Sequence, residues 1–384
     1  MNIHKALSNL FLICIPLYFT QGLFFSSGGP ISQFLALIWL LCCGIYVAIY
    51  ALSKERDKIA NALIVLWLSF LVYWLLSPKS VSGPGFTLPT FGDLKNASLV
   101  LLSYFPARYW NKKNIISSRW TETFLILMLL AAIAAYYLKR NTIMDDFGQA
   151  STNNTAYYFV VLLPLIGAFM NERRVYVLAL NAIVLLFLLY CAKRGAIFCY
   201  LISLIIFIRI VLFADRGKIK LSYLLMIALL LAIAAILVSQ TFSSSELLQN
   251  RLESTKEGDS SARNFLLAGL WLVFINSSFL VQLFGHGMSQ TVELIGGYAH
   301  NDWMELLTNQ GIFGVFIYLV LFYYIIITYR RNRHYMRADM KYMYLSAISC
   351  YFIRTIFSMG YLAPESAFFM IALGLSIPKS LSKI

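Results

Sequence analysis

Charged residues are scarce in this chain and make up only 12% of its 384 residues. An ordinary soluble domain carries about twice that share, so the composition excludes one. The four histidines form no H-x-x-x-H pair, and the sequence has no glycine-rich nucleotide-binding loop. Neither a metal site with tight ligand spacing nor chemistry driven by a bound nucleotide is therefore supported. The six cysteines lie within or at the edges of apolar runs, which predicts helix packing rather than a disulfide framework.

Apolar sequence takes the place of the missing charge. The chain is 60% hydrophobic with a mean hydropathy of +0.73, and many apolar runs approach the ~20 residues that cross a bilayer. We therefore predict an all-α polytopic membrane protein in which residues 1–384 form a single membrane domain. The runs predict about twelve membrane-spanning helices, at 7–24, 31–52, 59–77, 94–107, 120–138, 155–171, 174–191, 195–214, 221–239, 312–329, 341–358 and 361–378.

The distribution of basic residues sets the predicted orientation. The net charge of +14 is concentrated in alternate loops, such as 54–58, 108–119, 216–220 and 330–341. Cytoplasmic loops of membrane proteins carry such an excess, so we expect these loops and both termini to lie in the cytoplasm. Because the charge follows the topology, it does not indicate a nucleic-acid partner.

One long hydrophilic stretch, residues 240–311, falls on the opposite side and is predicted to be a periplasmic catalytic loop. A membrane crossing at 264–284 would move the basic loop 330–341 to the outside and break the charge pattern. We therefore expect Phe265–Ile275 to be a short helix that lies in the membrane interface. The Pro/Gly-rich segment Ser77–Phe91 is expected to link two helices on the same face.

The end of this loop contains the most informative residue, His300. Asp302 is expected to cap a helix, with Glu305 reaching back from the third helical position, and Gly311 is placed to end that helix before the next span. A histidine near a helix N-terminus is favoured in its neutral form, which accepts a proton. His300 in this form can take a proton, and the same helix N-terminus can hold an anion such as a phosphate. Asn301 and Asp302 are the neighbouring residues expected to support it.

Further basic residues are expected on the same outer face. Arg263 heads the predicted interfacial helix, and Lys193 and Arg194 lie between the seventh and eighth spans. Arginine on this face departs from the usual charge bias, and its planar fork of donors suits a diphosphate. Contact with lipid headgroups is the alternative interpretation, and spacing alone does not separate the two.

Two ionisable residues lie inside predicted spans. Arg354, near the outer end of the eleventh span, is expected to pair with Glu365 at the start of the twelfth. The pair could serve as a structural clamp or contribute to a diphosphate pocket, and the sequence leaves both open.

Other chemistry around the outer loop is less favoured. His286 lies between two glycines and is expected to be a turn residue. A metal site built from His286, Glu293, His300 and Asp302 lacks tight ligand spacing. Residues 287–291 lack the second glycine of a nucleophile elbow, which argues against a serine hydrolase.

Five short motifs follow one another between roughly residues 150 and 330. They are Lys193-Arg194-Gly195-Ala196, Ser261-Ala262-Arg263, Leu283-Phe284-Gly285-His286-Gly287, Ala299-His300-Asn301-Asp302 and Gly311-Ile312-Phe313-Gly314. In order, spacing and topology they resemble the O-antigen ligase and O-antigen polymerase superfamily of bacterial envelope glycosyltransferases. The N-terminal spans match that superfamily only in hydropathy, and Lys193 stands where the family usually has serine.

The resemblance implies a glycosyltransferase of the bacterial inner membrane that needs no metal and no cofactor. It would transfer a glycan from a polyprenyl diphosphate carrier to a sugar hydroxyl at the periplasmic face, with inversion at the anomeric carbon. On this pattern His300 matches the general base, and Arg194 and Arg263 match the arginines that bind the diphosphate. Lys193 and Arg354 are expected to support them.

Two acceptors remain open. The compact outer loop favours a polymerase, whose acceptor is another lipid-linked repeat unit, over a ligase, whose acceptor is lipid A-core. The expected partners are the polyprenyl diphosphate-linked oligosaccharide, the acceptor, membrane lipids and a chain-length regulator. A polysaccharide or lipid transporter is the alternative from another class, and it is disfavoured because the polar residues gather at one face rather than at the bilayer midplane.

Overall fold

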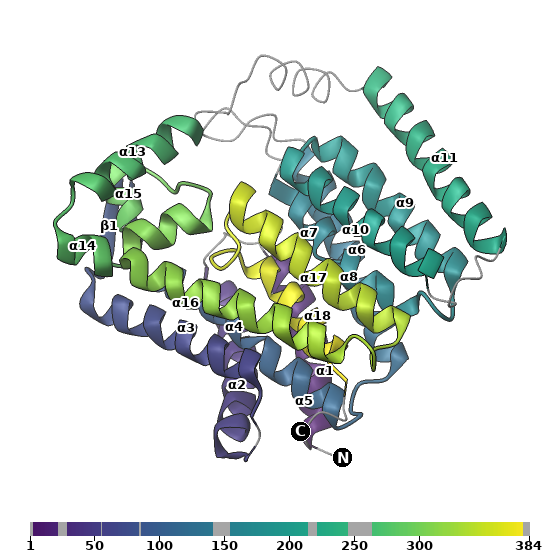
Figure 1. Ribbon diagram of the computed structural model, residues 1–384, viewed down its shortest axis with the longest axis horizontal. Coiled ribbons are helices and arrows are strands. Elements are labelled where there is room, and N and C mark those ends of the chain that lie inside the picture. The colour runs from purple at the N-terminus through teal and green to yellow at the C-terminus, as the bar shows by residue number, and fades with distance from the viewer. Residues whose placement is uncertain are drawn as a thin grey trace.

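The structure is a computed structural model. It describes residues 3–21, 29–54, 56–83, 86–140, 154–213, 221–244 and 263–378. Nearly all of these residues are helical, which confirms the all-α part of the prediction (Figure 1). The exception is a small antiparallel hairpin of β1 (Ser80–Gly83) and β2 (Phe86–Pro89). It occupies the segment Ser77–Phe91, which the sequence predicted only as a connection.

Six helices of the described residues are long and apolar enough to cross a membrane. They are α1 (Ile3–Gln21), α2 (Pro30–Leu52), α3 (Lys58–Leu76), α6 (Ser118–Arg140), α10 (Arg194–Phe213) and α16 (Asp302–Asn332).

Further helices occupy the other six predicted spans. They are α4 (Phe91–Leu102) with α5 (Tyr104–Lys112), α7 (Ala156–Val160) with α8 (Leu163–Ile166) and η2 (Gly167–Phe169), α9 (Arg174–Cys191), α11 (Leu221–Ser244), α17 (Ala338–Phe357), and η3 (Pro364–Ser366) with α18 (Ala367–Ser376). Each predicted span therefore falls on helical structure, although several of these helices are short or broken.

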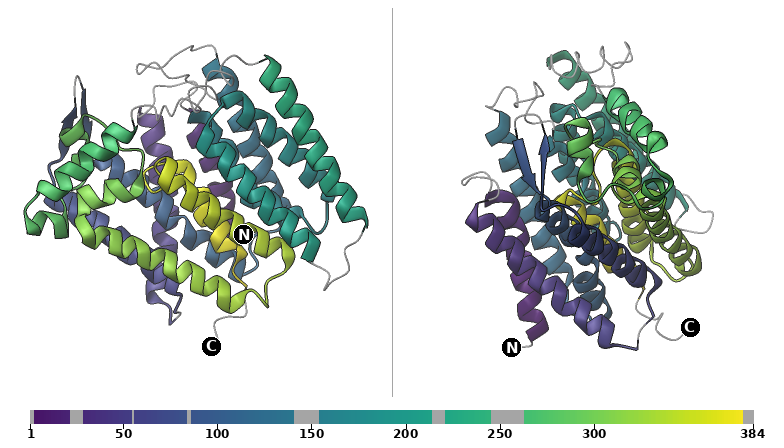
Figure 2. Two further views of the ribbon diagram at one scale, coloured as in Figure 1. Left: turned by 45° about the horizontal axis from the view of Figure 1, so that its top comes forward. Right: turned by 90° about the vertical axis from the view of Figure 1, so that its left-hand side faces the viewer.

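The helices pack side by side around the C-terminal pair α17 and α18 (Figures 1 and 2). Helix α17 packs against α10 and α18, and α18 packs against α5. Phe368, Phe369 and Met370 of α18 are fully buried, so this short helix fills the centre of the molecule. All six cysteines are buried and unpaired, in agreement with a packing role.

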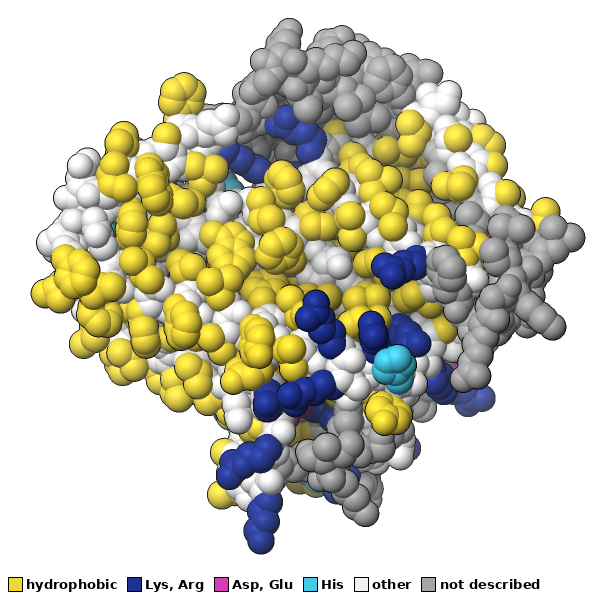
Figure 3. Space-filling model, in the orientation of Figure 1, with side chains coloured by type: hydrophobic (Ala, Val, Ile, Leu, Met, Phe, Trp, Pro, Cys, Tyr) yellow, Lys and Arg dark blue, Asp and Glu magenta, His cyan; other side chains and the backbone are white. Residues whose placement is uncertain are grey.

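The outer surface is strongly apolar (Figure 3). Phe34, Leu41, Leu75 and Phe316 expose more than half of their accessible area. An apolar surface this wide is costly in water and suits contact with lipid chains. Basic side chains gather below this surface in Figure 3, and the C-terminal end of α16 carries Arg330 and Arg331.

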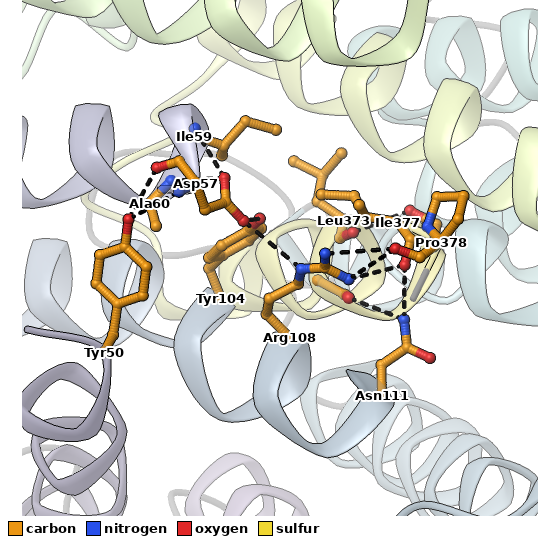
Figure 4. A network of polar contacts seen from close by, with 12 residues as sticks. Tyr50, Asp57, Ile59, Ala60, Tyr104, Arg108, Asn111, Leu373, Ile377 and Pro378 are labelled. Carbon is orange, nitrogen blue, oxygen red and sulfur yellow. Dashed lines mark hydrogen bonds and ion pairs between the residues drawn. The ribbon is translucent and has the colours of Figure 1, made fainter. Parts of the chain in front are cut away.

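A polar network joins three helix ends at one side of the bundle (Figure 4). Asp57 caps α3 by accepting hydrogen bonds from the Ile59 and Ala60 amides, and it accepts another from the Tyr104 hydroxyl at 2.6 Å. Arg108 of α5 lies 3.5 Å from the Asp57 carboxylate and donates to the Ile377 carbonyl at 2.8 Å. The network thereby ties the start of α3 to α5 and to the carbonyls that follow α18.

Candidate functional site

The predicted outer loop contains three helices of its own. They are α13 (Arg263–Asn276), α14 (Phe279–Phe284) and α15 (Gln290–Ile295), and α13 contains the expected short apolar helix Phe265–Ile275. Phe265, Trp271 and Phe279 expose half or more of their area. Residues 245–262 of the loop, including Ser261 and Ala262 of the arginine motif, lie outside the described part of the chain.

Two glycines fix how the loop packs on α16. Gly311 has φ +67° and ψ −164°, so it breaks α16 into a short helix and a long one, as the sequence predicted. A Cβ on Gly311 would lie 2.4 Å from the Leu283 carbonyl, and a Cβ on Gly285 would lie 2.4 Å from the Asn309 carbonyl. Only glycine therefore permits the two backbones to approach this closely.

The start of α16 differs from the prediction. Asn301, not Asp302, is the N-cap, and its Oδ1 accepts hydrogen bonds from the Trp303 and Met304 amides at 3.0 Å. Asp302 is the first helical residue and is fully buried. It accepts hydrogen bonds from the Tyr318 hydroxyl and the Gly360 amide, so it anchors the helix inside the protein and does not support His300 from the surface.

Glu305 also has a different role from the one expected. Its buried carboxylate accepts hydrogen bonds from the Ala299 amide and the Thr291 hydroxyl, both at 2.5 Å, instead of capping the helix. Since Ala299 immediately precedes His300, this contact fixes the backbone on which the histidine stands. His300 has φ +53°, a conformation that residues with side chains adopt rarely and that concentrates at functional sites.

The His300 side chain reaches the surface. The surrounding protein still removes part of the water around the ring, and this burial lowers the pKa of the imidazole to about 4, with help from the positive charges of Arg263 and Lys193. At neutral pH the ring is therefore uncharged and able to accept a proton. The structure places three of the predicted site residues close enough to influence one another.

The C-terminal end of α17 holds two of the site residues in place. The Asn301 side-chain amide donates to the Ile356 carbonyl at 3.0 Å, and Arg263 donates through Nη1 to the Phe357 carbonyl at 2.9 Å. The last carbonyls of a helix have no partner within it, so they are available for such bonds. Sequence analysis identified Asn301 and Arg263 but not the helix end that joins them.

The turn between α9 and α10 supplies the next group. Ala192 ends α9 in the left-handed conformation at φ +50°, and the Lys193 carbonyl accepts the first hydrogen bonds of α10, from Ala196 and Ile197. Lys193 is buried, and its Nζ lies 5.9 Å from the centre of the Tyr157 ring. Arg194, the first residue of α10, is half-buried.

Arg354 reaches the same aromatic ring from α17. It is buried, its guanidinium carbon lies 4.3 Å from the centre of the Tyr157 ring, and it forms an ion pair with Glu365. The predicted pairing of Arg354 with Glu365 is therefore confirmed. Lys193 and Arg354 converge on Tyr157, a residue that sequence analysis did not single out.

A second polar network lies behind the loop. Asp93, buried at the start of α4, accepts hydrogen bonds from the Ser289 hydroxyl at 2.5 Å and from the Tyr298 hydroxyl at 3.0 Å. This network attaches the segment before His300 to α4. Sequence analysis missed Asp93, and the available signal was a lone carboxylate at the start of an apolar run.

His286 takes the structural role expected of it. Its backbone amide donates to the Thr308 carbonyl, and its Nε2 lies 3.0 Å from the Ser277 hydroxyl. The part of the chain that the structure describes contains no cluster of three or more His, Cys, Asp or Glu residues that could hold a metal ion.

The site thus combines a neutral histidine, an amide and several cations at one face of a helical bundle. Lys and Arg side chains gather beside a histidine at the upper edge of Figure 3. Such a group can take a proton from a hydroxyl and stabilise an anion next to it.

Comparison of the sequence with models of known protein families finds no match, and comparison with curated proteins finds no match either.

Proposed function

We propose that this chain is a bacterial surface-polysaccharide polymerase. It transfers a glycan from a polyprenyl diphosphate carrier to a sugar hydroxyl of another lipid-linked repeat unit. The observation that carries the proposal is that Arg263 and Asn301, the neighbour of His300, bind successive carbonyls at the end of α17, which brings an arginine and the strained backbone of the histidine to one place. A general base and an anion site are the two parts that such a transfer needs.

In the proposed reaction, His300 takes the proton of the acceptor hydroxyl as its oxygen attacks the anomeric carbon. The bond between that carbon and the diphosphate oxygen breaks with inversion, and the electron pair leaves with the diphosphate. Arg263, Arg194 and Lys193 balance the charge that develops on the leaving group. Asn301 holds the backbone of the histidine against α17. The reaction uses no metal ion and no cofactor.

The proposed topology supports this chemistry. Twelve spans would leave both termini in the cytoplasm and residues 240–311 in the periplasm, with α13 in the membrane interface. The exposed apolar side chains of α13 fit that position. Reporter fusions after residue 384 and after residue 297 test it, and we expect a cytoplasmic signal from the first and a periplasmic signal from the second.

The test of function is transfer by the purified protein in EDTA, on a polyprenyl diphosphate-linked repeat unit with and without lipid A-core. We expect glycan lengthening without lipid A-core, and His300→Ala should lower the rate by about 10²–10⁴-fold. His334→Ala is the matched control, because His334 lies in the turn between α16 and α17. Transfer that needs lipid A-core would identify a ligase instead. Undiminished transfer by His300→Ala would remove this histidine from the mechanism, and no transfer by the wild type would favour a transporter.

A further inference from the structure

Among the residues that the structure describes, two buried polar atoms beside the cationic group make no hydrogen bond within 3.5 Å. They are the hydroxyl of Tyr157 and Nη1 of Arg354, on side chains that are 2% and 1% exposed. The Tyr157 hydroxyl has only a weaker interaction with the Ser358 side chain. The other nitrogens of Arg354 are occupied, since Nε donates to the Met359 carbonyl and Nη2 pairs with Glu365. Buried polar atoms are nearly always satisfied, so two orphans in one contacting pair need an explanation.

The position of Tyr157 links this pair to the surface site. A Cβ on Gly195 would lie 2.8 Å from the Tyr157 hydroxyl and 2.9 Å from Cβ of Phe357. The hydroxyl therefore points toward the start of α10, next to Arg194. The carbonyl of Phe357 is the one that binds Arg263. Tyr157 and Arg354 thus lie directly behind the residues proposed to bind the diphosphate.

The charges around the pair favour a polyvalent anion. Lys193 and Arg354 both lie over the Tyr157 ring, Arg263 is bound to the neighbouring helix end, and Glu365 contributes one opposing carboxylate. These four side chains carry a net positive charge. A phosphoryl oxygen accepts hydrogen bonds from both a guanidinium and a phenol, which are the two groups that make no close hydrogen bond.

We propose that Tyr157 and Arg354 form the inner wall of the anion site and donate hydrogen bonds to one phosphoryl group of the diphosphate. The carrier's diphosphate then lies between α7, α10 and α17, instead of resting at the surface against Arg263 alone. Lys193 lies over the same ring and donates to Oδ1 of Asn154 at 3.4 Å, and it exchanges this bond for one to the anion as the anion enters. This inference rests on the proposed function, because it assigns two more residues to the same diphosphate site.

The test uses Tyr157→Phe in the full-length protein. Removing a hydroxyl that makes no close hydrogen bond should leave the melting temperature unchanged or slightly higher, whereas loss of a bond to a charged oxygen should weaken ligand binding about tenfold or more. The probes are inorganic pyrophosphate and a short-chain polyprenyl diphosphate, measured by calorimetry, with the polyprenyl monophosphate as the comparison. We expect the monophosphate to bind more weakly than the diphosphate in the wild type.

Tyr200→Phe is the matched control, because the Tyr200 hydroxyl is equally buried and makes no hydrogen bond to any residue that the structure describes. We expect it to behave like Tyr157→Phe in melting temperature but to leave the dissociation constant unchanged. Arg354→Lys keeps the positive charge but loses the planar guanidinium donors. If this variant folds, it should weaken binding of the probes as Tyr157→Phe does.

The outcomes separate this inference from the proposed function. Suppose that the wild type binds both probes and that His300→Ala is defective in transfer. If Tyr157→Phe then binds pyrophosphate and the polyprenyl diphosphate as the wild type does, the proposed role of Tyr157 and Arg354 is wrong and the proposed function stands. Failure of the wild type to bind either probe would overturn both. Equal weakening by Tyr157→Phe and Tyr200→Phe would show that the effect is general to buried tyrosines, and would also overturn the inference.

Discussion

Arg263 and Asn301 donate hydrogen bonds to successive carbonyls of one helix end, those of Phe357 and Ile356. The two residues are 38 positions apart in sequence, since Arg263 begins α13 and Asn301 caps α16. The end of α17 therefore binds both Arg263, the arginine proposed to hold the anion, and Asn301, the neighbour of His300. Any movement of this helix end would displace both parts of the proposed site together.

The pH profile of transfer should report the environment of His300. Burial, Arg263 and Lys193 lower the pKa of this histidine to about 4, so the base stays neutral until the pH falls to that value. We expect kcat/KM for the donor to be flat from neutral pH downward and to decline only near about pH 4. Arg263→Gln removes a positive charge that disfavours the imidazolium, so the acid limb should move to higher pH.

Arg56→Gln is the control for this profile, because Arg56 is exposed just before α3. Rates of both variants and the wild type would be measured over the same pH series. An acid limb that stays in place when Arg263 is replaced would mean that this arginine does not act on the base.

Asn301 should have two separable roles. Asn301→Ala removes the N-cap of α16 and should lower the free energy of unfolding by about 1 kcal/mol. Asn301→Ser keeps a capping oxygen but loses the amide that binds the Ile356 carbonyl, so it should retain stability and lose activity. Denaturant unfolding and transfer rates on both variants check this. Full activity in Asn301→Ser would show that the tether to α17 is dispensable.

Gly311→Ala should be strongly destabilising. The methyl group would lie 2.4 Å from the Leu283 backbone, and φ at this position is +67°. Both effects oppose folding, and we expect a loss of about 3 kcal/mol or more in the free energy of unfolding. Gly297→Ala is the control, since no atom of the described part of the chain lies within 4 Å of its Cβ position. Comparable thermal stability of the two variants would contradict the close approach of the loop and α16.

Glu365→Gln should leave the Arg354 charge buried without its partner. Breaking a buried ion pair from one side costs about 3–5 kcal/mol. Glu122→Gln breaks the more exposed pair with Arg173 and should cost about 0–1 kcal/mol. Unfolding measurements on the two variants compare the pairs directly. Similar small losses from both would indicate that Arg354 reaches water or another anion when Glu365 is replaced.

Much of the helical framework was predictable because its signals are local. A run of apolar residues determines where a helix can be buried, and Gly311 breaks α16 through its own backbone conformation. The pairing of Arg354 with Glu365 was predictable as well, because two charges in adjacent apolar segments have few other partners. His300, Arg263 and Lys193 were also identified in advance, since charged residues are conspicuous in so apolar a sequence.

The predicted N-cap of α16, Asp302, was wrong. Asn301 and Asp302 are both good capping residues, and which of them caps the helix depends on the residues around them. Asp302 enters the helix because the Tyr318 hydroxyl and the Gly360 amide bind its carboxylate inside the protein. The lone carboxylate of Asp93 was a weak signal and Tyr157 had none, and the partners of both lie far along the chain.

The sequence by itself determined the apolar helices, the break at Gly311 and the residue types available for chemistry, because each depends on neighbouring residues and on transfer from water. Only the tertiary structure decided that Lys193 and Arg354 meet at Tyr157, and that Arg263 and Asn301 share the end of α17. Those contacts join segments that are distant in sequence. They exist only once the packing of α7, α10, α16 and α17 has brought the segments together.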